Sequence, residues 1–219
     1  DALGRLIKDE DPVGGSVTLS RTEQSNGYTV TTTSALGRSR AYQVEQLYTG
    51  AIRRSVTQPS GAKTTTLINT DGSKQITNPD GSSSTVQYGP DPRWGMLAPR
   101  LLKRVRTVPG GQTETTTSQR TVSLADPNNL LSLQALTDTV TVNGRTFTRS
   151  YDAATRTMTD TSAEGRQTVS VLDAQGRVIS LELAPGVAPI AVTYDTQGRV
   201  IENRQGTQAW TYSYDARNR

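Results

Sequence analysis

The clearest indication of the fold of this chain is Tyr194–Ile201, with the sequence YDTQGRVI. It reads tyrosine, aspartate, two variable residues, glycine, arginine and then two apolar residues. Leu172–Ile179 repeats the phrase with leucine in place of tyrosine, Asp1–Ile7 lacks the first residue, and Tyr214–Arg219 is cut off at its end. Self-similarity of this kind is the signature of a repeat architecture, in which each unit is one supersecondary element that packs on its neighbours.

The spacing of aspartates and glycines gives the period of the repeat. Asp152, Asp173 and Asp195 are 21 and 22 residues apart, and a shorter spacing of 11, 11 and 9 residues separates Gly50, Gly61, Gly72 and Gly81. Strands usually run for about five to six residues and hairpin loops for two to five. The half-unit therefore predicts one strand and one turn, and the full unit a β-hairpin. We expect about 20 antiparallel strands, each beside its neighbours in sequence.

The turns have the residues that hairpins require. In the complete phrase, Gly198 can take a positive φ and Asp195 can bond the backbone of its own turn, so that Arg199 begins the next strand. Further hairpins are indicated by Asp-Gly and Asn-Gly pairs, which occur at Asn26-Gly27, Asp71-Gly72, Asp80-Gly81 and Asn143-Gly144.

The regularity of the repeat divides the chain into three parts. Residues 1–87 read as degenerate repeat hairpins, 88–140 as an irregular proline-rich insertion with longer strands in the same sheet, and 141–219 as regular repeats. Prolines disfavour a central strand, which predicts an irregular loop over 89–99, with Gly95 free of any demand for positive φ. Leu130–Leu136 fits either a helical turn or a strand.

Composition argues against most catalytic and metal chemistry. The chain has no histidine and no cysteine, and only 32% of its residues are hydrophobic. The usual general base is therefore missing, and we expect no catalytic residue, cofactor or metal. For the acidic run Asp9-Glu10-Asp11 we favour a solvated loop over a calcium site. For the basic run Arg100–Arg106 we favour a solvated strand face over a nucleic-acid site. No segment approaches the length of a membrane helix.

Together these residues resemble the RHS or YD-repeat family. The resemblance rests on a set of repeat-defining positions: Asp1, Gly4, Arg5, Gly37, Arg38, Tyr151, Asp152, Gly165, Arg166, Asp173, Gly176, Arg177, Tyr194, Asp195, Gly198, Arg199, Tyr214 and Asp215. It implies an all-β fold of repetitive antiparallel hairpins in a long, curved or spiral sheet, a segment of a YD-repeat β-shell. Such shells enclose a toxic polypeptide in polymorphic toxins and toxin complexes, and serve adhesion in teneurins.

Three functions follow from the sequence and the resemblance. The first is a non-enzymatic structural segment of a large exported bacterial protein, secreted or at the cell surface, whose shell or stalk encloses or presents another polypeptide. Its partners would be adjacent repeats of the same parent protein and an encapsulated toxin domain, with no nucleic acid and no membrane insertion. The second is a surface adhesin that binds glycan through an exposed aromatic and basic sheet face, with Trp210, Tyr212 and Tyr214 as its candidate ligand residues. An enzyme ranks last.

Overall fold

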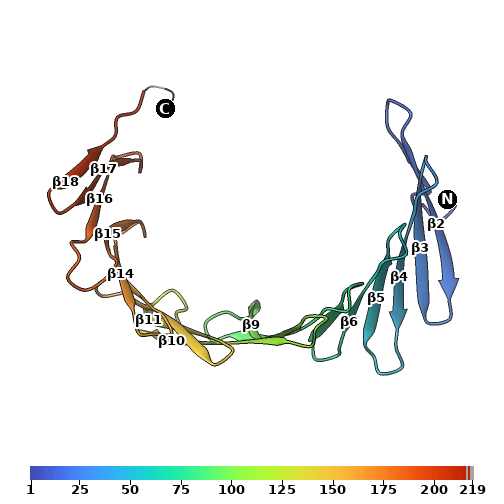
Figure 1. Ribbon diagram of the computed structural model, residues 1–219, viewed down its shortest axis with the longest axis horizontal. Coiled ribbons are helices and arrows are strands. Elements are labelled where there is room, and N and C mark those ends of the chain that lie inside the picture. The colour runs from blue at the N-terminus through green and yellow to red at the C-terminus, as the bar shows by residue number, and fades with distance from the viewer. Residues whose placement is uncertain (216, 218–219) are drawn as a thin grey trace. The chain divides into compact units, whose positions relative to one another are not determined.

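The computed structural model describes residues 1–215 and 217, and within them the chain is all-β (Figure 1). It confirms the predicted fold class, because 18 strands form one antiparallel sheet and no helix occurs in the described part. The count falls short of 20 because four central strands, β8 to β11, are each 9 to 13 residues long. The strands are β1 (Lys8–Glu10), β2 (Ser16–Gln24), β3 (Gly27–Ser34), β4 (Ser39–Gln46), β5 (Ile52–Thr57), β6 (Lys63–Ile68), β7 (Lys74–Thr77), β8 (Ser83–Asp91), β9 (Gly95–Thr107), β10 (Thr113–Leu124), β11 (Leu133–Val142), β12 (Arg145–Asp152), β13 (Thr157–Thr161), β14 (Gln167–Leu172), β15 (Val178–Glu182), β16 (Ile190–Tyr194), β17 (Val200–Gln205) and β18 (Gln208–Thr211).

The chain forms two compact units. The first holds residues 1–89 and 101–116, and the second holds 90–100 and 117–219. Strands β8, β9 and β10 therefore contribute residues to both units.

Each strand pairs with its neighbours in sequence, as short turns require. The pairing of β11 with β12 ends at Val142 and Arg145, so Asn143-Gly144 forms a two-residue turn in which both residues have positive φ. Asn26-Gly27 behaves differently, because β2 and β3 pair from Gln24 and Gly27, and Gly27 is already a strand residue. A Cβ on Gly27 would lie 1.9 Å from the carbonyl oxygen of Val44 on β4. Glycine is needed there for close strand approach and not for the turn.

The sheet has almost no buried apolar core. Among the described residues Ala51 is the one buried hydrophobic side chain, at 5% exposure. Most strand residues are instead half-buried, as in β3 and β13, where every position is of this kind. Threonine and valine suit such a surface because their branched side chains pack against cross-strand neighbours. Thr32, for example, lies opposite Leu19 on β2 and Arg40 on β4.

The predicted loop over 89–99 is wrong for most of its length. Strand β8 continues to Asp91 and β9 begins at Gly95, which leaves only residues 92–94 as the connection. Pro90 is tolerated because β7 pairs with β8 only as far as Val86. Beyond that point β8 has no β7 residue opposite it, so the missing N–H of proline breaks no bond on that side.

The segment around Leu130, for which the sequence allows a helical turn or a strand, does not form a helix. Residues 125–132 form a loop of consecutive turns, in which the N–H of Asn129 donates to the Asp126 carbonyl and that of Ser132 to the Asn129 carbonyl. Strand β11 then begins at Leu133. The strand alternative therefore applies from Leu133 onward, and Leu130 and Leu131 lie in the loop.

Candidate functional site

One five-residue turn recurs through the described chain and links its hairpins. In each copy the N–H of the first residue donates to the carbonyl of the fifth, and the N–H of the fourth, a glycine, donates to the carbonyl of the first. Each of these glycines has a φ between 74° and 88°, in the left-handed region that suits a residue without a Cβ. The eleven copies begin at Asp1, Asp11, Ser34, Leu47, Gln58, Asn69, Asn78, Val108, Ser162, Asp173 and Asp195.

An aspartate at the first position stabilises the turn through hydrogen bonds from its later residues. One carboxylate oxygen of Asp195 accepts the N–H groups of Gln197 and Arg199, each at 2.9 Å. The other accepts Nε of Arg199 at 2.7 Å. The backbone N–H of Arg199, helped by its guanidinium, holds the pKa of the Asp195 carboxyl below its ordinary value. The aspartate therefore fixes the turn and also positions the arginine side chain.

The positioned arginine then contacts the next repeat. Arg199 stacks over the ring of Tyr214 with 4.5 Å from Cζ to the ring centroid, and the Tyr214 hydroxyl donates to the Val200 carbonyl at 2.6 Å. Arg177, held by Asp173, repeats the arrangement over Tyr194 at 4.4 Å, and the Tyr194 hydroxyl donates to Val178. We call this Asp–Arg–Tyr arrangement the repeat lock. It joins neighbouring hairpins through charge-assisted hydrogen bonds and a cation–π contact.

The remaining repeat-defining residues form only parts of the lock. Asp1 binds Arg5 as Asp195 binds Arg199, but Arg5 faces Glu23 at 3.5 Å and no tyrosine ring. At Gly37-Arg38 and Gly165-Arg166 a serine replaces the aspartate, and its hydroxyl accepts only the N–H of the arginine. The Tyr151-Asp152 copy forms a different turn, in which Arg156 and not a glycine takes the positive φ of 53°.

Asp11 is a turn residue that sequence reasoning placed in a solvated acidic run. Its carboxylate accepts the N–H groups of Val13 and Gly15, as the repeat aspartates do. The signal was available in the spacing of Asp11 and Gly14, which matches that of Asp195 and Gly198.

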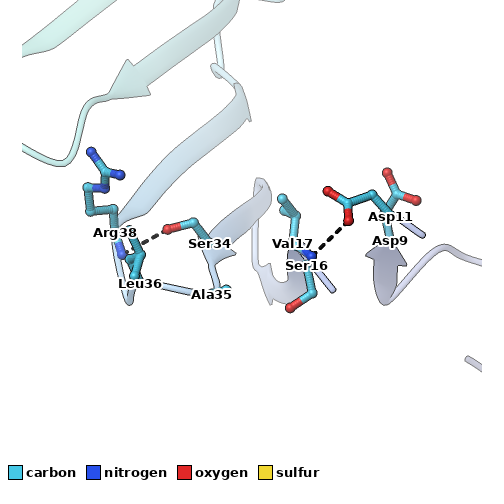
Figure 2. A pocket seen from close by; sticks show the side chains of 9 residues that line it. Asp9, Asp11, Ser16, Val17, Ser34, Ala35, Leu36 and Arg38 are labelled. Atoms are coloured by element: carbon cyan, nitrogen blue, oxygen red, sulfur yellow. Dashed lines mark hydrogen bonds between the residues drawn. The ribbon is translucent and has the colours of Figure 1, made fainter. Parts of the chain in front are cut away.

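Turns 11–15 and 34–38 lie at an open groove of about 330 Å³, shown in Figure 2. Asp9 and Asp11 lie on one side, and Ser34 and Arg38 on the other. The turn already uses the Asp11 carboxylate. No group of three histidine, cysteine, aspartate or glutamate residues able to hold a metal ion occurs in the described chain.

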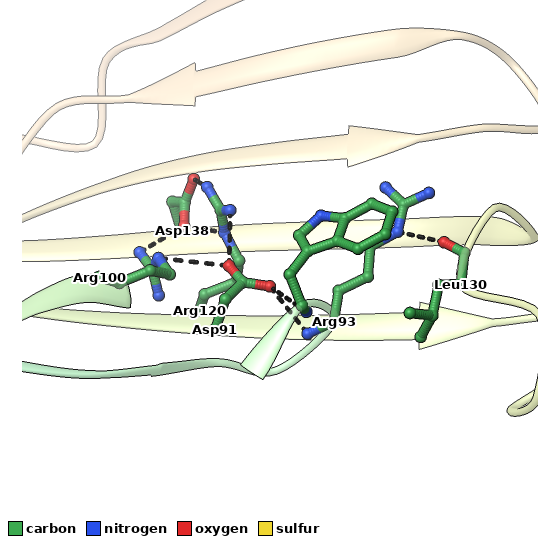
Figure 3. A network of polar contacts seen from close by, with 7 residues as sticks. Asp91, Arg93, Arg100, Arg120, Leu130 and Asp138 are labelled. Carbon is green, nitrogen blue, oxygen red and sulfur yellow. Dashed lines mark hydrogen bonds and ion pairs between the residues drawn. The ribbon is translucent and has the colours of Figure 1, made fainter. Parts of the chain in front are cut away.

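An ion cluster around a buried aspartate, shown in Figure 3, lies in the second unit. Asp91 is 3% exposed and contacts Nη1 of Arg120 at 3.0 Å and Nε of Arg100 at 3.8 Å. Asp138 in turn accepts Nη2 of Arg120 at 2.6 Å and Nη2 of Arg100 at 2.9 Å. Two carboxylates and two guanidiniums thus alternate, and strands β8, β9, β10 and β11 each supply one. Arg100 is therefore part of a cluster, and the predicted solvated face is wrong for this residue.

The Asp91 carboxylate also caps the β8–β9 turn. It accepts the backbone N–H groups of Arg93 and Trp94 at 2.8 and 3.1 Å. Burial alone would raise the pKa of Asp91, but these two N–H groups and the Arg120 guanidinium outweigh it, so the pKa lies below its ordinary value. The cluster thus connects the β8–β9 turn to Arg120 of β10 and Asp138 of β11. The sequence analysis did not predict this cluster.

An apolar tip projects beside this cluster. We use the name for a set of exposed residues: Trp94 in the β8–β9 turn, Met96 and Leu97 at the start of β9, and Leu130 and Leu131 in the β10–β11 loop. Arg93 joins the two segments because its guanidinium stacks over the Trp94 ring and donates to the Leu130 carbonyl (Figure 3). Leu97 is 93% exposed. Arg93 thus links Trp94 to Leu130, and exposed apolar side chains that lie near one another are candidates for contact with other molecules.

The predicted aromatic ligand face divides into two parts. Trp210 and Tyr212 are 53% and 45% exposed. Tyr214 is only half-exposed, and its ring and hydroxyl both belong to the repeat lock. Tyr214 therefore has a structural role in this arrangement, while the other two rings face solvent.

These features define a class of protein. An antiparallel sheet with one recurrent glycine turn, few buried side chains and Asp–Arg–Tyr contacts between successive hairpins is a YD-type repeat sheet. The model of the Teneurin YD-shell family matches residues 1–219, and the chain belongs to this family. The resemblance drawn from the sequence is thereby confirmed.

Comparisons with individual proteins add little. No curated protein matches the sequence. A porin-like protein from Bacteroides uniformis is 12% identical, with a TM-score of 0.29 and 94% of each chain covered. The TCP10 domain of CPAP from Danio rerio, in complex with a STIL peptide, is 18% identical, with a TM-score of 0.18, and the match covers 91% of this chain and 99% of that one. Similarities this low support no argument about function.

Proposed function

We propose that this chain is a non-enzymatic structural segment of a large exported bacterial RHS-repeat protein, secreted or at the cell surface. In this role the sheet builds part of a shell or stalk that encloses or presents another polypeptide, such as a toxin domain. The observation that carries the proposal is the repeat lock, which in the region of β14 to β17 joins successive repeats through Arg177–Tyr194 and Arg199–Tyr214 without a shared apolar core.

The thinness of the sheet supports a role as a wall. Ala51 alone among the described hydrophobic residues is buried, so the strands gain stability from cross-strand pairs and turn contacts. A catalytic or ligand-binding domain of this length normally encloses a pocket in a packed core. The carboxylates at the first positions of the turns, such as Asp195, already serve as turn caps. Within the described residues no helix is both long and apolar enough to span a bilayer.

The apolar tip supports contact with a second polypeptide. Its hydrophobic side chains are solvated, although the ion cluster beneath them fixes the turn from which they project. Burying such side chains against a partner removes apolar area from water, which favours association by roughly 25 cal/mol per Å². In a sheet that forms a wall, the apolar tip would supply a hydrophobic surface for contact with the enclosed or presented polypeptide.

Site-specific photo-crosslinking in the intact parent protein tests this proposal. A photoreactive phenylalanine analogue at Leu97 should crosslink to a polypeptide segment outside residues 1–219. The same analogue at Tyr48, which is fully exposed in a five-residue turn, is the matched control and should give no such product. Equal crosslinking from both positions, or none from Leu97 in the folded protein, would refute a polypeptide-facing wall.

A further inference from the structure

The first repeat has the turn and the arginine of the repeat lock. Asp1 accepts Nε of Arg5 at 2.8 Å, as the aspartate does for its arginine in both complete locks. The N–H of Leu19 then donates to the carbonyl of Ile7, the second residue after Arg5. This bond continues the antiparallel pairing of β1 with β2. The first repeat therefore has the strand register that a lock needs.

The complete lock at Arg199 indicates which residue should be the tyrosine of the first repeat. The N–H of Tyr212 donates to the carbonyl of Ile201, the second residue after the arginine. Tyr214 follows two residues later and stacks with Arg199. The same count from the corresponding N–H donor in the first repeat ends at Arg21. An arginine therefore occupies the position of the lock tyrosine.

The missing ring leaves a groove of about 400 Å³ in the first unit, which we call the vacant lock. Its apolar lining is formed by Leu6, Ile7, Leu19 and Val30. Arg21 also lines the groove but does not close it, because its guanidinium is held elsewhere. It stacks over the Tyr28 ring at 3.6 Å and donates to the Glu23 carboxylate at 2.6 Å. The space that a lock tyrosine would fill is therefore open.

The residue after the lock arginine is uncovered in the first repeat. Leu6 is 64% exposed, whereas Val178 and Val200, which follow the arginines of the complete locks, are half-buried. The hydroxyls of Tyr194 and Tyr214 donate to the carbonyls of these two valines. Within the described residues, no group donates to the Leu6 carbonyl. An apolar surface and a hydrogen-bond acceptor are therefore both open where a tyrosine would lie.

We propose that the vacant lock binds a tyrosine side chain of the polypeptide that the sheet encloses or presents. The partner's ring stacks against the Arg5 guanidinium, and its hydroxyl donates to the Leu6 carbonyl, in the manner of Tyr214 in the complete lock. The ring covers Leu6 and Ile7, which removes apolar area from water, and the cation–π contact adds to this gain. The source of the tyrosine rests on the proposed function, whereas the preference of the groove for a phenol does not.

The charge around the vacant lock favours a neutral phenol over a phosphorylated one. Nε of Arg5 lies 2.8 Å from Oδ2 of Asp1, and its Nη1 lies 3.5 Å from Oε1 of Glu23. Nε of Arg21 lies 2.6 Å from the same glutamate oxygen. Each guanidinium thus already has a carboxylate partner, and these two arginines and two acidic residues leave no excess positive charge to attract a phosphate. A phosphate would also remove the hydroxyl donor that reaches the Leu6 carbonyl.

Methyl NMR of the 219-residue chain, titrated with N-acetyl-tyrosinamide, tests the proposal. We expect the methyl signals of the apolar lining residues to shift, because a bound aromatic ring perturbs nearby resonances. The methyl signals of Leu97 and Leu131, which are exposed in the second unit, should not shift. N-acetyl-phenylalaninamide should bind about fivefold more weakly, since it lacks the hydroxyl. N-acetyl-phosphotyrosinamide should also bind more weakly than the tyrosine derivative.

Three variants test the assignment of the binding surface. Arg21→Tyr should abolish the shifts, because the introduced ring completes the lock and fills the groove. Arg166→Tyr is the matched control and should bind as the wild type does, since Arg166 is exposed in the second unit. Arg5→Ala should weaken the binding about fivefold through loss of the cation–π contact. Circular dichroism establishes that each variant retains the sheet.

Four outcomes would overturn the proposal. The first is that no lining methyl signal shifts, and the second is that N-acetyl-leucinamide binds as well as the tyrosine derivative. The third is that folded Arg21→Tyr binds like the wild type. The fourth is self-association that Tyr48→Ala abolishes while the tyrosine derivative fails to bind, which would assign the groove to the exposed Tyr48 of a second copy.

The titration and the crosslinking experiment fail separately. Loss of the methyl shifts with the Leu97 crosslink intact would refute the vacant lock alone. A positive titration without that crosslink would refute the enclosed or presented polypeptide as the source of the tyrosine, and the groove would remain a site for a phenol.

Discussion

The guanidinium of Arg177 lies 4.4 Å from the centroid of the Tyr194 ring, while the Tyr194 hydroxyl donates to the carbonyl of Val178, the residue after that arginine. The tyrosine of one repeat therefore contacts the preceding repeat through both its ring and its hydroxyl. Arg199 and Tyr214 repeat the relationship. Because each hairpin contacts only its neighbours, the effect of breaking one lock should remain local.

Removing the Tyr194 hydroxyl should loosen one repeat boundary. Tyr194→Phe keeps the ring under Arg177 but leaves the Val178 carbonyl without its donor, at a cost of about 1 kcal/mol. Hydrogen exchange should accelerate in β15 and β16 and remain unchanged in β3 and β4. Tyr48→Phe is the control, because Tyr48 is fully exposed and should have no effect. Uniform acceleration along the whole chain would contradict a local lock.

Gly198→Ala should strain the turn that begins at Asp195. Gly198 has a φ of 81°, and an alanine held in the left-handed region costs about 1–2 kcal/mol. Gly110→Ala is the matched control, since Gly110 lacks a positive φ and its new Cβ would meet only the flexible end of Gln112. Urea denaturation should show a lower midpoint for the first variant and little change for the second.

Gly95 does not serve as a control for Gly198. The sequence predicts no demand for positive φ at Gly95, but its φ is +57°. A residue with a Cβ is therefore strained at both positions. The cause is the short β8–β9 connection, which replaces the irregular loop that the prolines indicated.

The repeat was predictable because it is local. Asp195, Gly198 and Arg199 lie within five residues, and each has a residue type suited to one task in the turn. The ion cluster was not predictable, because Asp91, Arg100, Arg120 and Asp138 are separated by 9 to 20 residues and come from four strands. Read singly, each is an ordinary surface charge. Only the register of the long central strands brings them together.

Asp91→Asn should weaken the ion cluster and its pH dependence. Loss of the charge removes the ion pair with Arg120 and weakens the cap on Trp94, for a cost of about 1.5–3 kcal/mol. Glu164→Gln is the control, because its pair with Arg145 is exposed and contributes little. Urea unfolding followed by Trp94 fluorescence, in a Trp210→Phe background, measures both.

The sign of the pH effect follows from the lowered pKa of Asp91. A carboxyl with a folded pKa below its unfolded value stabilises the native state fully above the unfolded pKa of about 3.9. That contribution is lost as the pH falls from there through the folded pKa. The wild type should therefore lose stability below about pH 4 more steeply than Asp91→Asn. Parallel curves would show that Asp91 is not ionised in the cluster.

Gly27→Ala should force two strands apart. The new Cβ would lie 1.9 Å from the Val44 carbonyl oxygen and 3.0 Å from the Glu45 Cα, both of them backbone atoms that no rotamer change can move. Overpacking of this kind costs about 1–3 kcal/mol or more. Gly61→Ala separates this effect from backbone strain, since Gly61 has a φ of 84° but nothing within 4 Å of its new Cβ. We expect Gly27→Ala to accelerate hydrogen exchange in β3 and β4, and Gly61→Ala to accelerate it in β5 and β6. The acceleration should be larger for Gly27→Ala. The opposite ranking would show that β3 and β4 separate at little cost, and that the glycine is retained there for another reason.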